Sequence, residues 1–97
     1  MSKFENAPEE VREVHKLLVE NAIERFGDKE FGEDAVYTRE RPNGNWIVGP
    51  NFENFGDSMI YKPGEGWFYR ESWSGVDNAM RGGYEEAKGN ARCFFTG

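Results

Sequence analysis

The stretch AVYTRERPNGNWIV, residues 35–48, decides the fold class because it predicts a β-hairpin. Asn43-Gly44 lies between two runs that are rich in β-branched and aromatic residues. Asn-Gly favours a type I′ turn, in which both central residues take positive φ angles. The sequence therefore predicts antiparallel strands at about 35–41 and 45–49.

Two more strands are predicted after the hairpin. SMIYK at residues 58–62 is the first, and WFYRESW at residues 67–73 is the second. Strand alternation places every other residue from Trp67 onwards on one face. A sheet with one covered face would bury that row of rings. The rings of this row that are expected in the core are Trp67, Tyr69 and Trp73. Trp46, in the second strand of the hairpin, is expected there too.

The segment before the hairpin has helical periodicity. From Val11 onwards its apolar residues recur in steps of three and four, which trace one face of a helix. Asn6 and Glu9 are spaced as in a capping box, and Gly27 suits a left-handed C-cap. The sequence therefore predicts a helix at about 8–26.

Two segments next to the predicted elements carry weaker patterns. DKEFGED, residues 28–34, is expected to be a solvated acidic connector. Residues 75–95 allow either one long helix or an irregular loop at 75–83 followed by a helix at about 84–94. Gly82-Gly83 favours the second interpretation, because each glycine inside a helix costs about 1 kcal/mol relative to alanine.

Together these elements predict an α+β fold. An N-terminal helix precedes a four-stranded antiparallel meander sheet, and a C-terminal helix packs on one sheet face. The length of 97 residues fits one small domain, residues 1–97.

The charge balance excludes some partners. The formal net charge is −6, and residues 1–34 hold ten acidic and five basic side chains, a net of −5. No basic cluster is present, so duplex nucleic acid and anionic membranes are not expected as partners. Cys93 is the only cysteine and no long apolar run occurs, which together predict a cytoplasmic protein.

No pattern in the sequence predicts catalysis or a cofactor. One histidine and one cysteine cannot supply the four ligands of a structural zinc site. His15 borders the apolar helix face, where a half-buried, hydrogen-bonded histidine is expected. Cys93 precedes two phenylalanines, and we expect that apolar setting to leave its thiol unactivated. We therefore predict a protein that is not an enzyme and that has no metal or cofactor.

The connection between the second and third strands is longer than a hairpin needs. It contains two phenylalanines among polar residues, as protein-binding loops often do. The residues predicted to bind a partner are Asn51, Phe52, Asn54, Phe55 and Asp57.

The function that this pattern favours is non-catalytic protein–protein interaction. Such a small acidic adaptor or inhibitor would bind a protein with a basic surface, or a second copy of itself. One alternative is a small-molecule module with an aromatic pocket between helix and sheet, lined by Trp46, Trp67 and Tyr69. Another is single-stranded nucleic-acid binding through exposed aromatic side chains.

Overall fold

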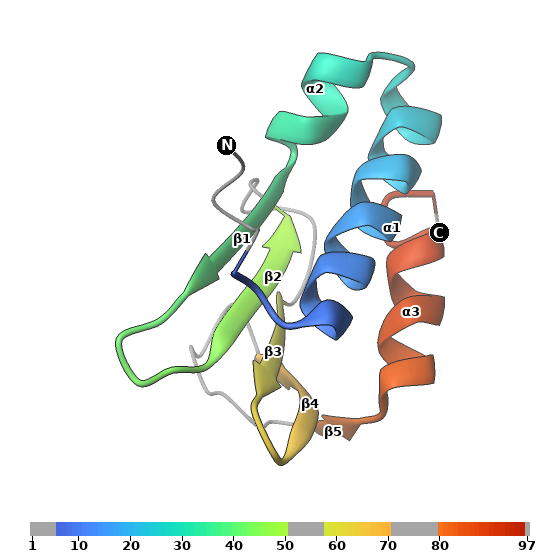
Figure 1. Cartoon of the computed structure of the whole chain (residues 1–97). Coiled ribbons are helices and arrows are strands. Elements are labelled where there is room, and N and C mark those ends of the chain that lie inside the picture. The colour runs from blue at the N-terminus through green and yellow to red at the C-terminus, as the bar shows by residue number, and fades with distance from the viewer. Residues whose placement is uncertain (1–5, 51–57, 71–79, 97) are drawn as a thin grey trace.

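The computed structural model describes residues 6–50, 58–70 and 80–96, with the backbone alone for residues 69–70 and 80–82. Two helices precede an antiparallel sheet and a third helix follows it (Figure 1). The predicted α+β fold is confirmed. The elements are α1 (Glu9–Phe26), α2 (Lys29–Asp34), β1 (Val36–Glu40), β2 (Trp46–Pro50), β3 (Ser58–Lys62), β4 (Gly66–Arg70), β5 (Met80–Gly82) and α3 (Tyr84–Cys93).

The sheet is a meander in chain order, β1-β2-β3-β4-β5, with every neighbouring pair antiparallel. The predicted strands are present, and the predicted continuation of β4 to residue 73 lies outside the described residues. β5 corrects the prediction of an irregular loop at 75–83, because Arg81 pairs with Phe68 of β4. So short a strand has almost no periodicity of its own, and the edge of β4 supplies its hydrogen bonds.

The hairpin between β1 and β2 is confirmed, but its turn is not the predicted type I′. The amide of Gly44 donates to the carbonyl of Arg41 at 2.9 Å, and the amide of Arg41 donates to the carbonyl of Asn45 at 2.7 Å. The loop therefore runs from Pro42 to Gly44, whose φ is 89°. Proline suits the first central position of a type I turn, so Pro42 moves the turn one residue towards the N-terminus.

α1 matches the predicted helix closely, and Gly27 caps it with a φ of 75°. The predicted capping box is wrong. The N-cap is Pro8, and no side chain accepts a hydrogen bond there. Asn6 lies too far upstream for that role once proline occupies the cap. Glu9, in the first turn, still faces the positive end of the helix dipole.

The acidic stretch 28–34 forms a helix, α2, rather than the irregular connector that its composition predicts. The side chain of Asp28 caps α2 by accepting from the amide of Phe31 at 3.0 Å. α2 also packs closely on α1, because a Cβ on Gly32 would lie 2.5 Å from Cγ1 of Ile23. A helix this short is unstable alone, so its cap and this close contact stabilise it.

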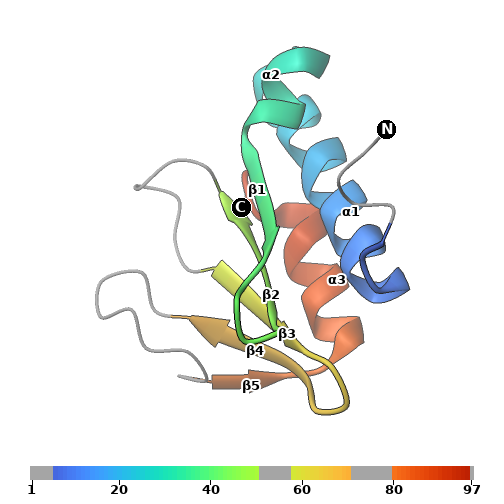
Figure 2. The same ribbon diagram turned by 60° about the vertical axis from the view of Figure 1, so that its left-hand side comes forward.

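α1 and α3 cover one face of the sheet, here called the inner face (Figure 2). Trp46 and Trp67 are 7% and 2% exposed and lie in the core between the layers, as predicted. Tyr69 has its backbone position on the same face, opposite Met59 in the register. The core prediction for Trp73 lies outside the described residues. The opposite side of the sheet is called the outer face.

α3 confirms the predicted C-terminal helix, and its end is held by Asn21 of α1. Asn21 is only 2% exposed. Its side-chain nitrogen donates to the carbonyl of Arg92 at 2.7 Å and to the hydroxyl of Thr96 at 2.9 Å. Its side-chain oxygen accepts from the amide of Phe95 at 2.6 Å. The polar groups that a helix end leaves unpaired are thus satisfied from a neighbouring helix.

Candidate functional site

The predicted recognition loop lies outside the described residues. Its binding residues Asn51, Phe52, Asn54, Phe55 and Asp57 all belong to residues 51–57. The strands that flank the loop approach each other closely, because a Cβ on Gly49 would lie 2.6 Å from the hydroxyl oxygen of Ser58. The role of the loop in binding stays a prediction.

His15 and Cys93 lie in different surroundings. His15 is half-buried, with Nδ1 2.7 Å from the hydroxyl oxygen of Thr38, which confirms the predicted boundary histidine. The apolar setting predicted for Cys93 is wrong, because its thiol is exposed and donates to the carbonyl of Gly89 at 3.4 Å. The helical turn carries position 93 to the solvent side, while Phe95 turns inward. That the protein is not an enzyme stays a prediction.

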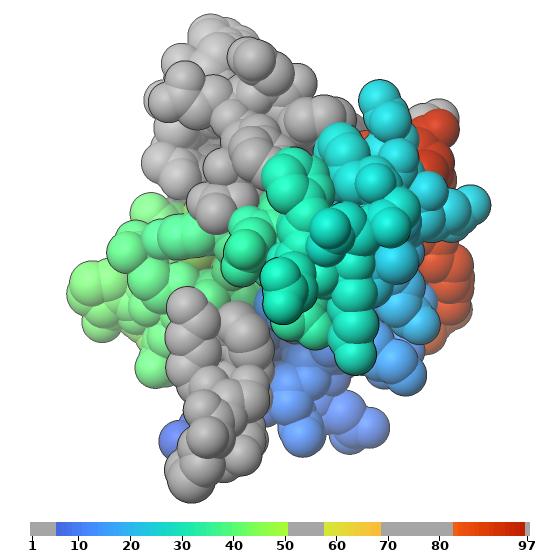
Figure 3. Space-filling view, turned by 90° about the horizontal axis from the view of Figure 1, so that it is seen from above, coloured from blue at the N-terminus to red at the C-terminus, as the bar shows by residue number. Residues whose placement is uncertain are grey.

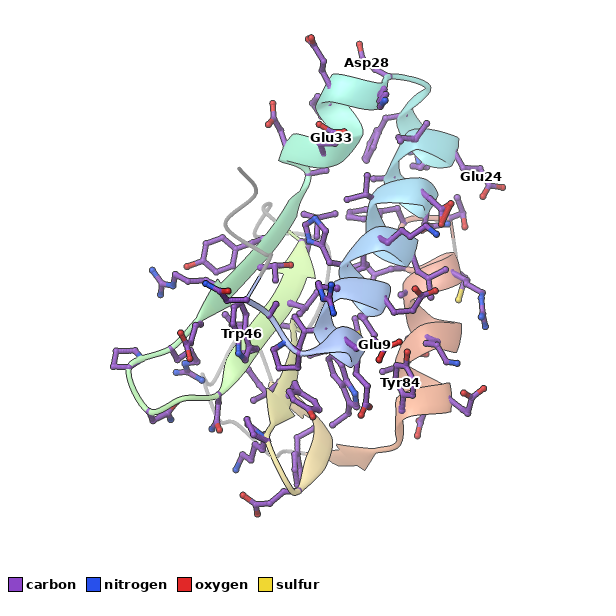
Figure 4. The ribbon with its side chains drawn as sticks, in the orientation of Figure 1. Glu9, Glu24, Asp28, Glu33, Trp46 and Tyr84 are labelled. Atoms are coloured by element: carbon purple, nitrogen blue, oxygen red, sulfur yellow. The ribbon has the colours of Figure 1, made fainter. Side chains whose placement is uncertain are left out.

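A cluster of polar and aromatic side chains lies where α1 and α3 begin. The indole nitrogen of Trp67 donates to Oε1 of Glu10 at 3.0 Å. Burial raises the pKa of the Tyr84 hydroxyl, against a smaller opposing effect of Lys88, and α1 carboxylates such as Glu9 add to the rise (Figure 4). Tyr84 therefore keeps its proton at neutral pH.

Metal and small-molecule sites have little support in the described part of the chain. No group of three or more histidine, cysteine or carboxylate side chains gathers there to hold a metal ion. The predicted aromatic pocket needs Trp46 and Trp67. Both are buried, and the ring of Trp67 packs against Tyr61 with a centroid distance of 5.2 Å.

The surface around α2 combines charge with one exposed ring. We call residues 24–34 the acidic end, which holds five acidic and two basic side chains, a net of −3. α2 lies towards the viewer when the molecule is seen from above (Figure 3). Phe31, at 42%, is the only large hydrophobic side chain exposed among the described residues.

Phe31 is the outermost member of an aromatic stack that extends from the surface into the core. Its ring meets Phe26 edge to face at a centroid distance of 4.9 Å. Phe26 meets Phe95 at 5.8 Å, and Phe95 meets Phe94 at 5.3 Å. Phe95 is buried. The stack holds Phe31 in place, so a partner that covers it loses little side-chain entropy.

Several carboxylates belong to the same end of the molecule as this ring. The side chain of Glu33 projects from α2 and that of Glu24 from α1, and Asp28 lies at the start of α2 (Figure 4). All three are exposed, as is Glu30 beside Phe31 in the chain. The guanidinium of Arg25 lies 5.2 Å from the centroid of the Phe26 ring. The acidic end therefore offers an apolar contact within a negative potential.

No family model, curated protein or solved structure matches this chain. None of the helices among the described residues is both long enough and apolar enough to cross a membrane. The function is therefore argued from the chemistry of the chain itself.

Sequence reasoning missed Phe31 because the charged letters around it predict a solvated connector. A usable signal was present. Asp28 and Glu30 are typical of an N-cap and a first helical turn. In a helix that starts at Lys29, Phe31 and Gly32 lie on adjacent positions. Gly32 lies against Ile23 of α1, whereas Phe31 contacts Phe26 at the end of α1 and stays 42% exposed.

Proposed function

We propose that this protein is a non-catalytic interaction domain whose acidic end binds a basic surface of another protein. The observation that carries the proposal is the exposed ring of Phe31, which packs on Phe26 within an end of the molecule that has a net charge of −3. Residues that dominate a binding energy are often aromatic, and polar groups that exclude water surround them.

The chemistry of the acidic end favours arginine as the partner's contact residue. A guanidinium can stack on a ring such as Phe31 and pair with carboxylates such as Glu33 at the same time. Its planar donors fit a carboxylate in a way that lysine cannot match. The net charge of the acidic end would also steer such a partner during encounter.

In this proposal the protein acts as an adaptor or an inhibitor. An acidic surface can occupy a basic groove that would otherwise hold nucleic acid, and such a decoy is one form of inhibition. A cytoplasmic location belongs to the same proposal, since Cys93 is a free thiol. The alternative partner is a second copy of this protein, bound through the sheet.

Replacing Phe31 by alanine tests the proposal. Partners are first captured from the native host with wild-type and Phe31→Ala protein as paired baits. The candidate that depends on Phe31 is then purified and measured by calorimetry. We expect Phe31→Ala to weaken binding by more than about 1 kcal/mol. The fold should persist, because the ring is already partly exposed in the free protein.

Two carboxylate variants separate local charge from total charge. Glu33→Gln removes a carboxylate of the acidic end, and Glu86→Gln removes an exposed one from α3. Glu33→Gln should slow association at low salt, whereas Glu86→Gln should leave the rate nearly unchanged. Equal rates for the two variants, or full affinity of Phe31→Ala, would contradict the proposal. Phe52→Ala and Phe55→Ala test the loop in the same assay.

A further inference from the structure

The outer face of the sheet differs in charge from the rest of the molecule. The register places a set of residues on it that includes cations from β1, β3, β4 and β5. The only acidic residue in the described strands, Glu40, pairs with Trp46 and so belongs to the inner face. The outer-face positions are Tyr37, Arg39, Ile47, Gly49, Ser58, Ile60, Lys62, Gly66, Phe68, Arg70 and Arg81.

Two of these cations lie over outer-face rings. The guanidinium carbon of Arg39 is 5.3 Å from the centroid of the Tyr37 ring. Nζ of Lys62 is 4.9 Å from the centroid of the Phe68 ring. Both rings are half-buried. Each pair puts a flat apolar surface next to a positive charge, and the pairs lie on different strands of one sheet.

The apolar side chains at the centre of the outer face are buried. Ile47 and Ile60 pair with each other across β2 and β3 and are 6% and 0% exposed. A stable protein interface usually needs an exposed apolar centre. The outer face offers cations and rings around a buried centre, which suits a flexible polyanion better than a folded protein.

We propose that the outer face of the sheet binds single-stranded nucleic acid. Bases stack on Tyr37 and Phe68, while Arg39 and Lys62 contact phosphates. Aromatic stacking combined with backbone neutralisation is the general mode of single-strand binding. The register places the backbone of Arg70 in β4 and of Arg81 in β5 on the same face. This site is separate from the acidic end and does not depend on the function proposed for it.

The same arrangement disfavours a duplex. In a duplex the bases are stacked on each other, so the rings of Tyr37 and Phe68 would have no free base faces to contact. The net charge of −6 opposes any long polyanion that extends beyond the basic face.

Fluorescence anisotropy with a labelled oligo-dT strand tests the proposal. A strand of roughly 15 nucleotides exceeds most site sizes on one small domain. If about four phosphates are neutralised, affinity should fall about fifty-fold between about 50 and 200 mM salt. Absence of binding at the lower salt concentration would overturn the proposal.

Paired variants test the location of the site. Arg39→Gln with Lys62→Gln should weaken binding by about tenfold or more and reduce the salt dependence. The matched control is Lys16→Gln with Lys29→Gln, which removes two exposed cations from the helices. An equal loss of affinity in the control would show that only total charge matters, and the site would be refuted.

Ring variants and competitors test the type of ligand. Tyr37→Leu or Phe68→Leu should weaken binding about fivefold or more without changing its salt dependence. A melting curve checks that each variant is folded. If poly-glutamate displaces the strand as well as unlabelled oligo-dT does, the face binds acidic protein instead. If a duplex binds as tightly as the strand, stacking on the rings is not the mode. Either result overturns the inference.

Discussion

The acidic end and the outer face of the sheet carry opposite charges and arise in different ways. The acidic end is one continuous run, residues 24–34, so its charge is visible in the sequence. The cations of the outer face come from positions between Arg39 and Arg81. Only strand pairing places them on one face of the sheet. The difference teaches that a net charge of −6 says little about any one surface. Both surfaces depend on the core that joins the helices to the sheet.

Removing the ring of Trp67 should break both surfaces at once. Trp67 is 2% exposed and lies on the inner face, where it contacts the helix layer. Trp67→Ala should lower the free energy of unfolding by about 3–5 kcal/mol, because the cavity adds to the lost apolar burial. Urea denaturation measures the effect.

Trp67→Phe is the matched control for this core prediction. It keeps a buried ring but removes the indole nitrogen that donates to Glu10. Its cost should be clearly smaller than that of Trp67→Ala. An unchanged melting temperature for Trp67→Ala would show that the two layers do not depend on this contact.

Asn21→Ala should loosen the helix layer alone. The change removes the hydrogen bonds to Arg92, Thr96 and Phe95 and leaves a buried amide without its acceptor. We expect a loss of about 2–4 kcal/mol in the free energy of unfolding. Thr96→Val removes one exposed partner only and should cost less than about 1 kcal/mol. Equal costs for the two variants would contradict the role of Asn21.

Two glycine variants should change stability in opposite directions. Gly32→Ala places a Cβ against Ile23, so α2 must shift on α1 at a cost of about 1–3 kcal/mol. Gly89→Ala, within α3, meets nothing within 4 Å and should stabilise the protein by up to about 1 kcal/mol. Thermal melts of the two variants and the wild type measure these changes in stability. A neutral Gly32→Ala would show that the acidic end does not need this close contact.

The smallest effect is expected at the ion pair between Lys88 and Glu85 on α3, where Nζ and Oε2 are 2.6 Å apart. The hydrogen bond from Lys88 lowers the pKa of the Glu85 carboxyl, and the positive charge of Lys88 adds to the shift. The pKa of Glu85 is lower in the folded protein than in the unfolded chain. The ion pair therefore stabilises the folded protein at pH values above the unfolded pKa. Its contribution disappears as the pH falls through the lowered pKa.

Lys88→Gln should therefore raise the pKa of Glu85 towards its ordinary range. A carboxyl NMR titration measures this shift directly. Stability should change little, since solvent and salt screen an exposed pair. A Glu85 pKa that stays low in the variant would show that Lys88 is not its cause.

Sequence reasoning succeeded where one segment carries its own pattern. α1 has a long apolar repeat and a glycine cap, and the strands are rich in β-branched and aromatic residues and are separated by turn residues. Trp46 and Trp67 were assigned to the core because alternation gives a strand only two faces. At the proposed acidic end the sequence carries the charge and a capping signal at Asp28, but it does not show that the short helix packs on its neighbour.

The amino-acid sequence by itself determined α1, the hairpin, the strands up to β4 and α3, because each has a local period or turn signal. Tertiary structure alone decided the packing of α2 on α1, the strand at β5, the contacts of Asn21 and the shared face of the outer-face cations. Those features depend on neighbours far away in the chain: Ile23 against Gly32, β4 beside β5, and Arg92 beside Asn21. Side-chain period is local, whereas close packing and strand pairing are set only when the chain has folded.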